Sequence, residues 1–223
     1  MKEIKVIAKR IDWSNLEAKF DSLLPTLYTA RKEAVERLNN QKAKLASMAT
    51  GLLLQEITKQ ELGIKPEELI ISKKEQGKPY IVGYEDFCFN ISHAGDMVAI
   101  AYGDSPVGID IELVRCREND LKVAKRCFAE EEYRFITEEA YELDMENISR
   151  SKEERFFMVW TMKEAYLKYK GTGISVPMKS FVVRPYENKI VGEKLTCEPV
   201  IINDYVYSVC VDEGVEVTLD ICS

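Results

Sequence analysis

The order of strand-type and helix-type segments is the feature of this sequence that most restricts its fold. A β-type run at Ile4–Ala8 precedes a helical stretch from about Leu16 to Leu62, in which apolar residues recur at helical spacing. The same order returns later, with a β-type run at Val107–Leu113 before helical stretches at about Asn119–Glu142 and Lys152–Lys170. The other β-type runs are Ile70–Ile71, Phe87–Ile91, Met97–Tyr102, Phe181–Arg184, Lys189–Val191, Tyr205–Val211 and Val215–Ile221. Strand, helices and strands therefore occur twice in succession.

This order predicts an α+β fold with two halves of similar plan, each a small, mainly antiparallel sheet packed with helices. The boundary falls near Ser105–Pro106, which gives an N-terminal half of residues 1–105 and a C-terminal half of residues 106–223. Gly63 and Gly171 follow helical stretches and are typical of helix ends, because glycine readily adopts the left-handed conformation there. The chain has 223 residues, of which 46% are hydrophobic, and this is enough to bury a substantial core.

The charge of the chain excludes one class of partner. The formal net charge is −7 and the pI is about 5.1, so no overall basic surface indicates nucleic-acid binding. An acidic protein that binds an anionic ligand needs a local site, made by a metal ion, converging basic side chains or exposed backbone N–H groups. We therefore expect no nucleic-acid partner, and a local site for any anionic ligand.

The cysteines and the single histidine argue against a zinc site. The six cysteines include no CxxC pair and His93 is the only histidine, so the chain lacks a Cys/His set with zinc-ligand spacing. The first residues, Met1–Lys5, have no apolar signal-peptide core, and no apolar run approaches the ~20 residues that span a bilayer. We therefore expect a reduced, cytoplasmic protein without a membrane partner.

Two carboxylates share one face of a predicted strand in the segment Val107–Glu112. Side chains alternate along a strand, so Ile109 and Ile111 can enter the core while Asp110 and Glu112 point to the other face. Two like charges ~4 Å apart repel by roughly 4 kcal/mol at an effective dielectric constant near 20. A metal ion, a bound proton or full solvation must offset this repulsion. The alternative is an ordinary edge strand with a solvated acidic face.

A second group of polar residues lies on the predicted helix that ends near Lys170. Trp160, Glu164 and Lys168 are spaced at i, i+4 and i+8 and therefore fall along one helix face. Taken alone, Glu164 and Lys168 read as a surface pair worth about 0.2–0.5 kcal/mol, with Trp160 at the edge of the core.

Together these segments resemble the paired signature of the 4′-phosphopantetheinyl transferases, in the surfactin-synthetase-activating (Sfp-type) branch. The signature is carried by Gly108–Glu112 and, further along, by Trp160–Ala165 and Lys168. Two upstream segments, Gly77–Tyr80 and Phe89–His93, resemble further blocks of the same branch. The close resemblance runs from about Gln76 to Phe181, and the rest of the chain matches only in general plan.

The resemblance implies a monomer with two pseudo-symmetric halves and coenzyme A bound in the cleft between them. It also implies Mg²⁺-dependent transfer of the 4′-phosphopantetheine arm of coenzyme A to a serine of an apo acyl or peptidyl carrier protein, with release of 3′,5′-ADP. The metal positions of the family correspond to Asp110, Glu112 and Glu164. Lys168 is the residue expected to stabilise or protonate the leaving phosphate, and Glu164 the expected base for the incoming serine, although a metal-bound water could carry that proton instead.

Further residues are expected to hold coenzyme A. The family places a phosphate contact where His93, and with it Ser92, stand here, and an adenine and ribose site at Gly77, Lys78 and Pro79. The 3′-phosphate contact expected by register is Arg31, with Lys42 and Lys44 as looser possibilities. Relatives carry Arg at positions that are Gln76 and Ala46 here, so the Ser47 hydroxyl is expected to supply a contact instead. Lys163 belongs to the signature as well and is expected to contact phosphate or the surroundings of the helix, with a solvated lysine as the alternative.

A basic cluster follows the acidic strand and is expected to dock the carrier protein, since carrier proteins are generally acidic. Its members are Arg115, Arg117, Lys122, Lys125 and Arg126, and the alternative for them is a solvated helix face.

Two other functions stay open: a hydrolase that cleaves the pyrophosphate of coenzyme A with water, and a protein that binds coenzyme A or a carrier without turnover. The pathway of the carrier, whether fatty-acid, polyketide or nonribosomal-peptide synthesis, does not follow from the sequence.

Overall fold

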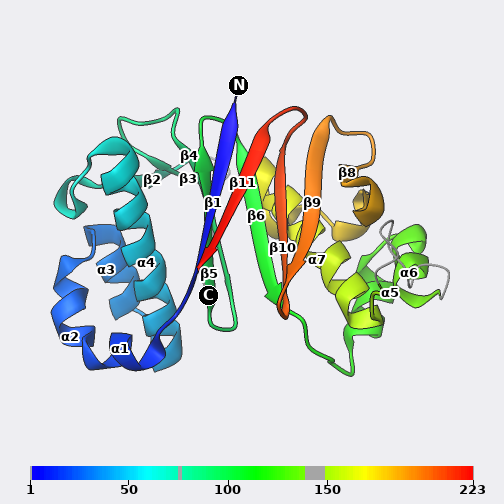
Figure 1. The fold of residues 1–223 in the computed structure, drawn as a ribbon, viewed down its shortest axis with the longest axis horizontal. Coiled ribbons are helices and arrows are strands. Elements are labelled where there is room, and N and C mark those ends of the chain that lie inside the picture. The colour runs from blue at the N-terminus through cyan, green and yellow to red at the C-terminus, as the bar shows by residue number, and fades with distance from the viewer. Residues whose placement is uncertain (1, 75–76, 139–148, 223) are drawn as a thin grey trace.

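The computed structural model describes residues 2–74, 77–138 and 149–222 and has the predicted α+β architecture. The described residues form seven α-helices, two larger sheets of four and five strands, and a separate two-stranded sheet. The two larger sheets lie next to each other in the middle of the molecule, with helices α1–α4 on one flank and α5–α7 on the other (Figure 1). The prediction of two mainly antiparallel halves packed with helices is confirmed.

The first sheet has the strand order β11-β1-β5-β4. Its strands are β1 (Glu3–Arg10), β4 (Cys88–Ala94), β5 (Met97–Gly103) and β11 (Glu216–Cys222). The pairs β1/β5 and β4/β5 are antiparallel, whereas β1 and β11 are parallel and lie side by side in Figure 1. The last strand of the chain therefore belongs to the sheet of the N-terminal half, so the predicted division at residue 105 does not separate all elements of the two halves.

The helices that flank this sheet replace the single helical stretch expected from Leu16 to Leu62. They are α1 (Trp13–Ala18), α2 (Phe20–Leu23), α3 (Thr29–Glu36) and α4 (Gln41–Leu62), with a short 3₁₀ turn between α2 and α3. Pro25 lies in that turn, where proline fits because it lacks the N–H that a helix interior needs.

Helix α4 is the longest helix of the first half and has clear signals at both ends. The Asn40 side chain accepts a hydrogen bond from Ala43 N at its start, and Gly63 adopts the left-handed conformation (φ 70°) at its end, as predicted. After a 3₁₀ turn at Pro66–Glu68, the strands β2 (Ile71–Lys73) and β3 (Pro79–Ile81) form the two-stranded sheet.

The second sheet is antiparallel throughout and has the strand order β6-β10-β9-β8-β7. Its strands are β6 (Val107–Leu113), β7 (Val183–Arg184), β8 (Lys189–Ile190), β9 (Leu195–Ile202) and β10 (Tyr205–Asp212). Strand β9 was not expected, because Glu198 and Pro199 interrupt its apolar pattern. It pairs along its full length with β10.

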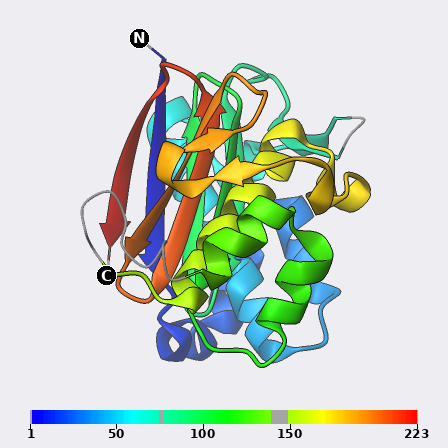
Figure 2. The same ribbon diagram turned by 90° about the vertical axis from the view of Figure 1, so that its right-hand side faces the viewer.

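Helix α7 packs on one face of this second sheet, and two shorter helices pack on the outside of α7 (Figure 2). The predicted helix at Asn119–Glu142 is two helices, α5 (Asp120–Cys127) and α6 (Glu130–Thr137), with an extended break at Phe128 and Ala129. The final part of that prediction, residues 139–142, lies outside the described residues. Helix α7 (Lys152–Lys170) has the predicted bounds.

Helix α7 is well defined by its ends. Ser151 and Glu154 form a capping box, in which each side chain bonds the other's backbone N–H, and Gly171 ends the helix with φ 74°. The helix crosses β6 in direct backbone contact at Gly108, where a Cβ atom would collide with Ala165 O and Tyr169 N. This contact fixes the helix that carries Glu164 and Lys168 against the strand that carries Asp110 and Glu112, because only glycine allows so close an approach.

The two sheets pack on each other through an apolar layer. Ile4 and Val6 of β1 belong to the same buried cluster as Ile109 and Ile111 of β6, and all four side chains are at most 1% exposed. The alternation predicted for β6 is therefore confirmed, with its isoleucines in the core. No helix among the described residues is long and apolar enough to cross a membrane.

Candidate active site

Strands β4 and β6 meet at a seam between the two sheets that is held by side chains in place of a backbone ladder. The Asn90 side chain accepts a hydrogen bond from Ile109 N at 2.9 Å, and Ser92 Oγ accepts one from Ile111 N at 3.2 Å. Asn90 and Ser92 are two residues apart and therefore point to the same side of β4. They bring the middle of β6, and with it Asp110, against β4.

Asp110 lies at the centre of this seam and is 6% exposed. Its Oδ1 atom accepts hydrogen bonds from Ser92 Oγ at 2.8 Å and from Lys168 Nζ at 2.7 Å. Its Oδ2 atom is buried and has no hydrogen-bond partner among the described residues. A buried carboxylate oxygen without a partner costs about 1–3 kcal/mol or more, so this atom is a natural ligand for a cation.

Two further carboxylates share the electrostatic environment of Asp110. Glu112 and Glu164 are half-buried, and burial raises the pKa of both groups. The negative charge of Asp110 raises the pKa of both further, whereas Lys168 lowers it. Arg117 lies 3.8 Å from Glu112 and also offsets its charge. Asp110 is therefore electrostatically coupled to both glutamates, although the three carboxylates do not converge on one point in the described residues.

Lys168 connects this acidic group to the first half of the chain. Its ammonium group donates to Ser92 Oγ at 3.0 Å as well as to Asp110, so strand β4, strand β6 and helix α7 meet at these three side chains. The Lys168 side chain is 28% exposed and that of Asp110 is 8% exposed. The ammonium group is thus held in place while part of the side chain still faces solvent.

His93 lies next to Ser92, at an exposed position of β4. Loss of water around the ring lowers its pKa, and the positive charges of Lys168 and Arg31 lower it further, whereas Asp110 opposes them. The imidazole is therefore neutral at pH 7 and lies within electrostatic range of two cations, and its contact with a phosphate stays a prediction.

Arg31 and Ser47, predicted to contact the same phosphate, are neighbours in the structure. Arg31 Nη1 donates to Ser47 Oγ at 3.3 Å and Arg31 Nε donates to Tyr28 OH at 3.1 Å. Gly51 makes room for the arginine, since a Cβ atom there would lie 2.5 Å from Arg31 Cγ. Lys42, a looser candidate, lies over the ring of Trp13 instead, with its Nζ 5.1 Å from the centroid.

In the turn before β3, the ammonium group of Lys78 is bound to two backbone carbonyl groups of the chain itself. Gly77 has a φ of 90°, and Pro79 starts β3. The Lys78 Nζ atom donates to Val107 O and to Tyr169 O, at 3.0 Å in both cases. Backbone contacts of Gly77, Lys78 and Pro79 with a nucleotide stay a prediction, and Gln76 lies outside the described residues.

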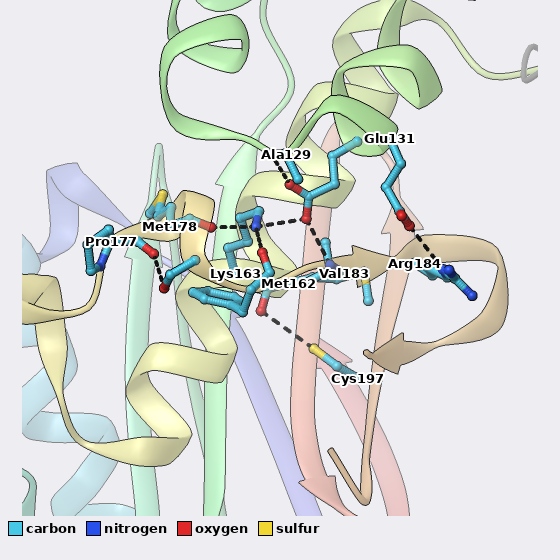
Figure 3. Close-up of polar contacts among 12 residues, drawn as sticks. Ala129, Glu131, Met162, Lys163, Pro177, Met178, Val183, Arg184 and Cys197 are labelled. Carbon is cyan, nitrogen blue, oxygen red and sulfur yellow. Dashed lines mark hydrogen bonds and ion pairs between the residues drawn. The ribbon is translucent and has the colours of Figure 1, made fainter. Parts of the chain in front are cut away.

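Lys163 is the predicted ligand contact that the structure does not bring to the site. Its side chain is fully buried, and its Nζ lies 2.7 Å from Glu132 Oε1, from Met178 O and from Phe181 O (Figure 3). Glu132 in turn accepts hydrogen bonds from Ala129 N and from Val183 N, both at 2.8 Å. The expectations of a phosphate contact and of a solvated lysine are therefore corrected, whereas the alternative of a contact with the surroundings of the helix agrees with the structure: Lys163 joins α7 to α6 and to the segment before β7.

The basic cluster expected to dock the carrier is exposed. Arg115 and Arg117 follow β6 directly, and Lys122, Lys125 and Arg126 lie on α5. Leu121 is exposed beside them, with 44% of its surface accessible. The surface therefore combines positive charge with one large apolar side chain.

Comparison with known proteins identifies the family. Residues 106–210 match the family model described as the 4′-phosphopantetheinyl transferase superfamily, and residues 11–104 match that of the 4′-phosphopantetheinyl transferase N-terminal region. The 4′-phosphopantetheinyl transferase psf-1 of Bacillus pumilus is 31% identical over 84% of this chain and 76% of the relative. The chain belongs to the 4′-phosphopantetheinyl transferase superfamily. The resemblance to the Sfp-type branch is confirmed.

Other transferases of this superfamily are similar to the chain to a comparable degree. The 4′-phosphopantetheinyl transferase gsp of Aneurinibacillus migulanus is 35% identical over 73% of this chain and 63% of the relative. The 4′-phosphopantetheinyl transferase Sfp of Bacillus subtilis (strain 168) is 29% identical over 74% of this chain and 69% of the relative. The matches thus extend well beyond the short segments that carry the signature.

Sequence reasoning missed several residues that hold the candidate site, or the helix that carries it, in place. Asn90 lies in the segment already singled out, two residues before Ser92, and strand alternation could have assigned both to one face. Glu132 and Tyr169 had no signal of their own, because their partners are far away in the sequence. Within the described residues, no three His, Cys, Asp or Glu side chains are grouped so that they could hold a metal ion as they lie.

Proposed function

We propose that this chain transfers the 4′-phosphopantetheine arm of coenzyme A to a serine hydroxyl of an apo acyl or peptidyl carrier protein, with release of 3′,5′-ADP. Membership of the transferase superfamily supports the reaction class. The observation that carries the proposal for this chain is the junction of Asp110, Ser92 and Lys168, at which a carboxylate and an ammonium group from the second half meet strand β4 of the first half.

The cationic side chains are suited to the pyrophosphate of coenzyme A. Lys168 lies in the second half of the chain and His93 in the first. Arg31 lies within electrostatic range of His93 and donates a hydrogen bond to Ser47. An anion near these groups would be attracted by the charges of Lys168 and Arg31 and would favour protonation of His93. We expect Lys168 and His93 to hold the pyrophosphate and Arg31 with Ser47 to hold the 3′-phosphate.

The carboxylates are suited to a divalent cation. Asp110, Glu112 and Glu164 would hold Mg²⁺, supported by the unpartnered Oδ2 atom of Asp110 and by the raised pKa values of the two glutamates. These side chains do not converge as they lie, so binding would need rotamer changes. When bound, Mg²⁺ would supply positive charge for the phosphate oxygens.

The chain's own groups account for the remaining requirements of the transfer. The serine oxygen forms a bond to the phosphorus that carries pantetheine, the bond from this phosphorus to the bridging oxygen breaks, and 3′,5′-ADP leaves with that oxygen. We expect Lys168 to stabilise the negative charge that develops on the leaving oxygen. Glu164 is the expected acceptor of the serine proton.

A mass measurement tests the proposal. Incubation with coenzyme A, Mg²⁺ and apo carrier protein should increase the carrier mass by one phosphopantetheine group. Release of free phosphopantetheine with an unchanged carrier would instead indicate a hydrolase, and no change in either would indicate a binding protein. Glu164→Gln should reduce turnover far more than coenzyme A affinity. Equal losses in both would assign Glu164 to metal or ligand binding alone.

A further inference from the structure

The ammonium group of Lys78 lies at the interface between the two halves of the chain. Lys78 precedes β3 in the first half, whereas both of its acceptors belong to the second half. They are Val107 O, at the first residue of β6, and Tyr169 O, in the last turn of α7, each 3.0 Å from Nζ. The ammonium also lies 5.5 Å from the centroid of the Tyr169 ring. One side chain thus joins three segments.

Tyr169 O is an acceptor that helix α7 cannot satisfy from within. The last four carbonyl groups of an α-helix have no intrahelical N–H partner, and the negative end of the helix dipole lies there. A cation that donates to such a carbonyl satisfies it and is attracted by the dipole. Lys78 is half-buried and does both from outside the helix.

The same turn of α7 is fixed on its other sides as well. Tyr169 lies on Gly108 of β6 so closely that a Cβ atom at Gly108 would collide with the Tyr169 backbone. The Tyr169 hydroxyl donates to Asp212 Oδ1 of β10 at 2.5 Å. Lys168, the preceding residue, reaches Asp110 and Ser92 from this turn. The position of the Lys168 ammonium therefore depends on how the last turn of α7 is held.

We propose that Lys78 is a positioning residue, which holds the last turn of α7 on β6 so that Lys168 reaches Asp110 and Ser92. Its catalytic consequence rests on the function proposed above. The role differs from that of a coenzyme A ligand, because a residue that only binds the substrate affects KM, whereas a residue that positions Lys168 affects kcat.

The structural part of the proposal can be tested without substrate, by hydrogen–deuterium exchange of peptides covering residues 164–171. Lys78→Met keeps the apolar stem and removes the donor, so exchange in this turn should become faster. Lys78→Arg keeps a donor cation and should restore much of the protection. Lys73→Met removes an exposed lysine of the same hairpin and should leave exchange unchanged. Unchanged exchange in Lys78→Met would overturn the proposal.

The catalytic part uses the carrier-mass assay. In Lys78→Met we expect kcat to fall about tenfold or more, since a displacement of ~1 Å can cost 10²-fold, while KM for coenzyme A changes little. A raised KM with unchanged kcat would overturn the positioning role in favour of ligand binding. If Lys78→Met does not fold, Lys78→Gln, which removes the charge, decides: wild-type KM with reduced kcat and faster exchange supports positioning, whereas a change in KM alone or wild-type kcat and exchange refutes it. Wild-type protein that transfers nothing would refute the proposed function, whereas the exchange measurements would still test this interface.

Discussion

Replacing Lys163 by Met should destabilise the protein strongly, although the residue belongs to the sequence signature of a transferase. The side chains of Lys163 and Glu132 are both 0% exposed, and their charged atoms are 2.7 Å apart. Burial lowers the pKa of Lys163 and raises that of Glu132, and each residue's charge opposes the shift of the other. Each charge is therefore tolerated in the interior only because the other is present.

The magnitude follows from what the substitution leaves behind. Removal of one partner of a buried ion pair costs about 3–5 kcal/mol, because the other charge stays buried without compensation. In Lys163→Met the carboxylate of Glu132 still accepts hydrogen bonds from the N–H groups of Ala129 and Val183, or it takes up a proton. Both effects reduce the cost of the uncompensated charge, so we expect a value at the lower end of this range. The carbonyls of residues 178 and 181 also lose their donor. We expect a loss of about 3 kcal/mol, a large part of the ~5–15 kcal/mol that stabilises a typical domain.

Urea unfolding followed by tryptophan fluorescence, to which Trp160 on the same helix contributes, measures this loss. A cycle of Lys163→Met, Glu132→Gln and the double variant should give a coupling energy of about 1–3 kcal/mol, since the residues are in direct contact. Lys170→Met is the matched control, because Lys170 forms a pair with Glu193 that is about one-third exposed on both sides and should contribute at most ~1 kcal/mol. Lys163→Met with wild-type stability, no coupling to Glu132 and weakened coenzyme A binding would refute this reasoning.

Three further outcomes are expected. Gly108→Ala should lower the free energy of unfolding by about 1–3 kcal/mol and reduce transfer, because the added methyl group pushes α7 and the Ala165 carbonyl away from β6. Wild-type thermal stability and activity in this variant would contradict the close contact. Because the pKa of His93 is lowered in the folded protein, the free energy of unfolding should rise as pH increases from that pKa to the ordinary value of ~6.5. Coenzyme A should bind with proton uptake in the same pH range. Calorimetry in buffers of different ionisation enthalpy should show this uptake, and His93→Gln should remove it. Charge reversal by Lys122→Glu and Lys125→Glu should raise KM for the carrier and weaken the salt dependence of this KM, without changing coenzyme A affinity. Unchanged carrier kinetics would exclude a docking role for α5.

The fold could be predicted where local pattern and tertiary packing agree. Helix α7 has its predicted bounds because Ser151 caps its start and Gly171 ends it. Strand β9 escaped prediction because Pro199 and Glu198 break its pattern, and its stability comes from pairing with β10. The pairing of β11 with β1 joins the two ends of the chain, and no local pattern carries that information.

The site could be predicted in its composition but less well in its contacts. Asp110 and Lys168 are 58 residues apart and were assigned to one site only through the resemblance, yet they form a direct ion pair. The roles of Lys163 and Lys78 could not be predicted, because a lysine in a signature is equally compatible with a phosphate and with a buried carboxylate or carbonyl. Only the three-dimensional structure shows which acceptor each ammonium group reaches.

The seam between β4 and β6 connects the architecture to the chemistry. Backbone ladders hold strands together almost independently of side-chain identity, whereas this junction depends on the side chains of Asn90 and Ser92. Ser92 bonds to the backbone of β6, to Asp110 and to Lys168 at once, so the atoms that hold the two sheets together are also those that arrange the charged groups. Acidic groups come from the second half and the predicted phosphate-binding groups from both halves. A ligand that bridges the seam would therefore stabilise the contact between the sheets as well as its own binding, because both rest on the same hydrogen bonds.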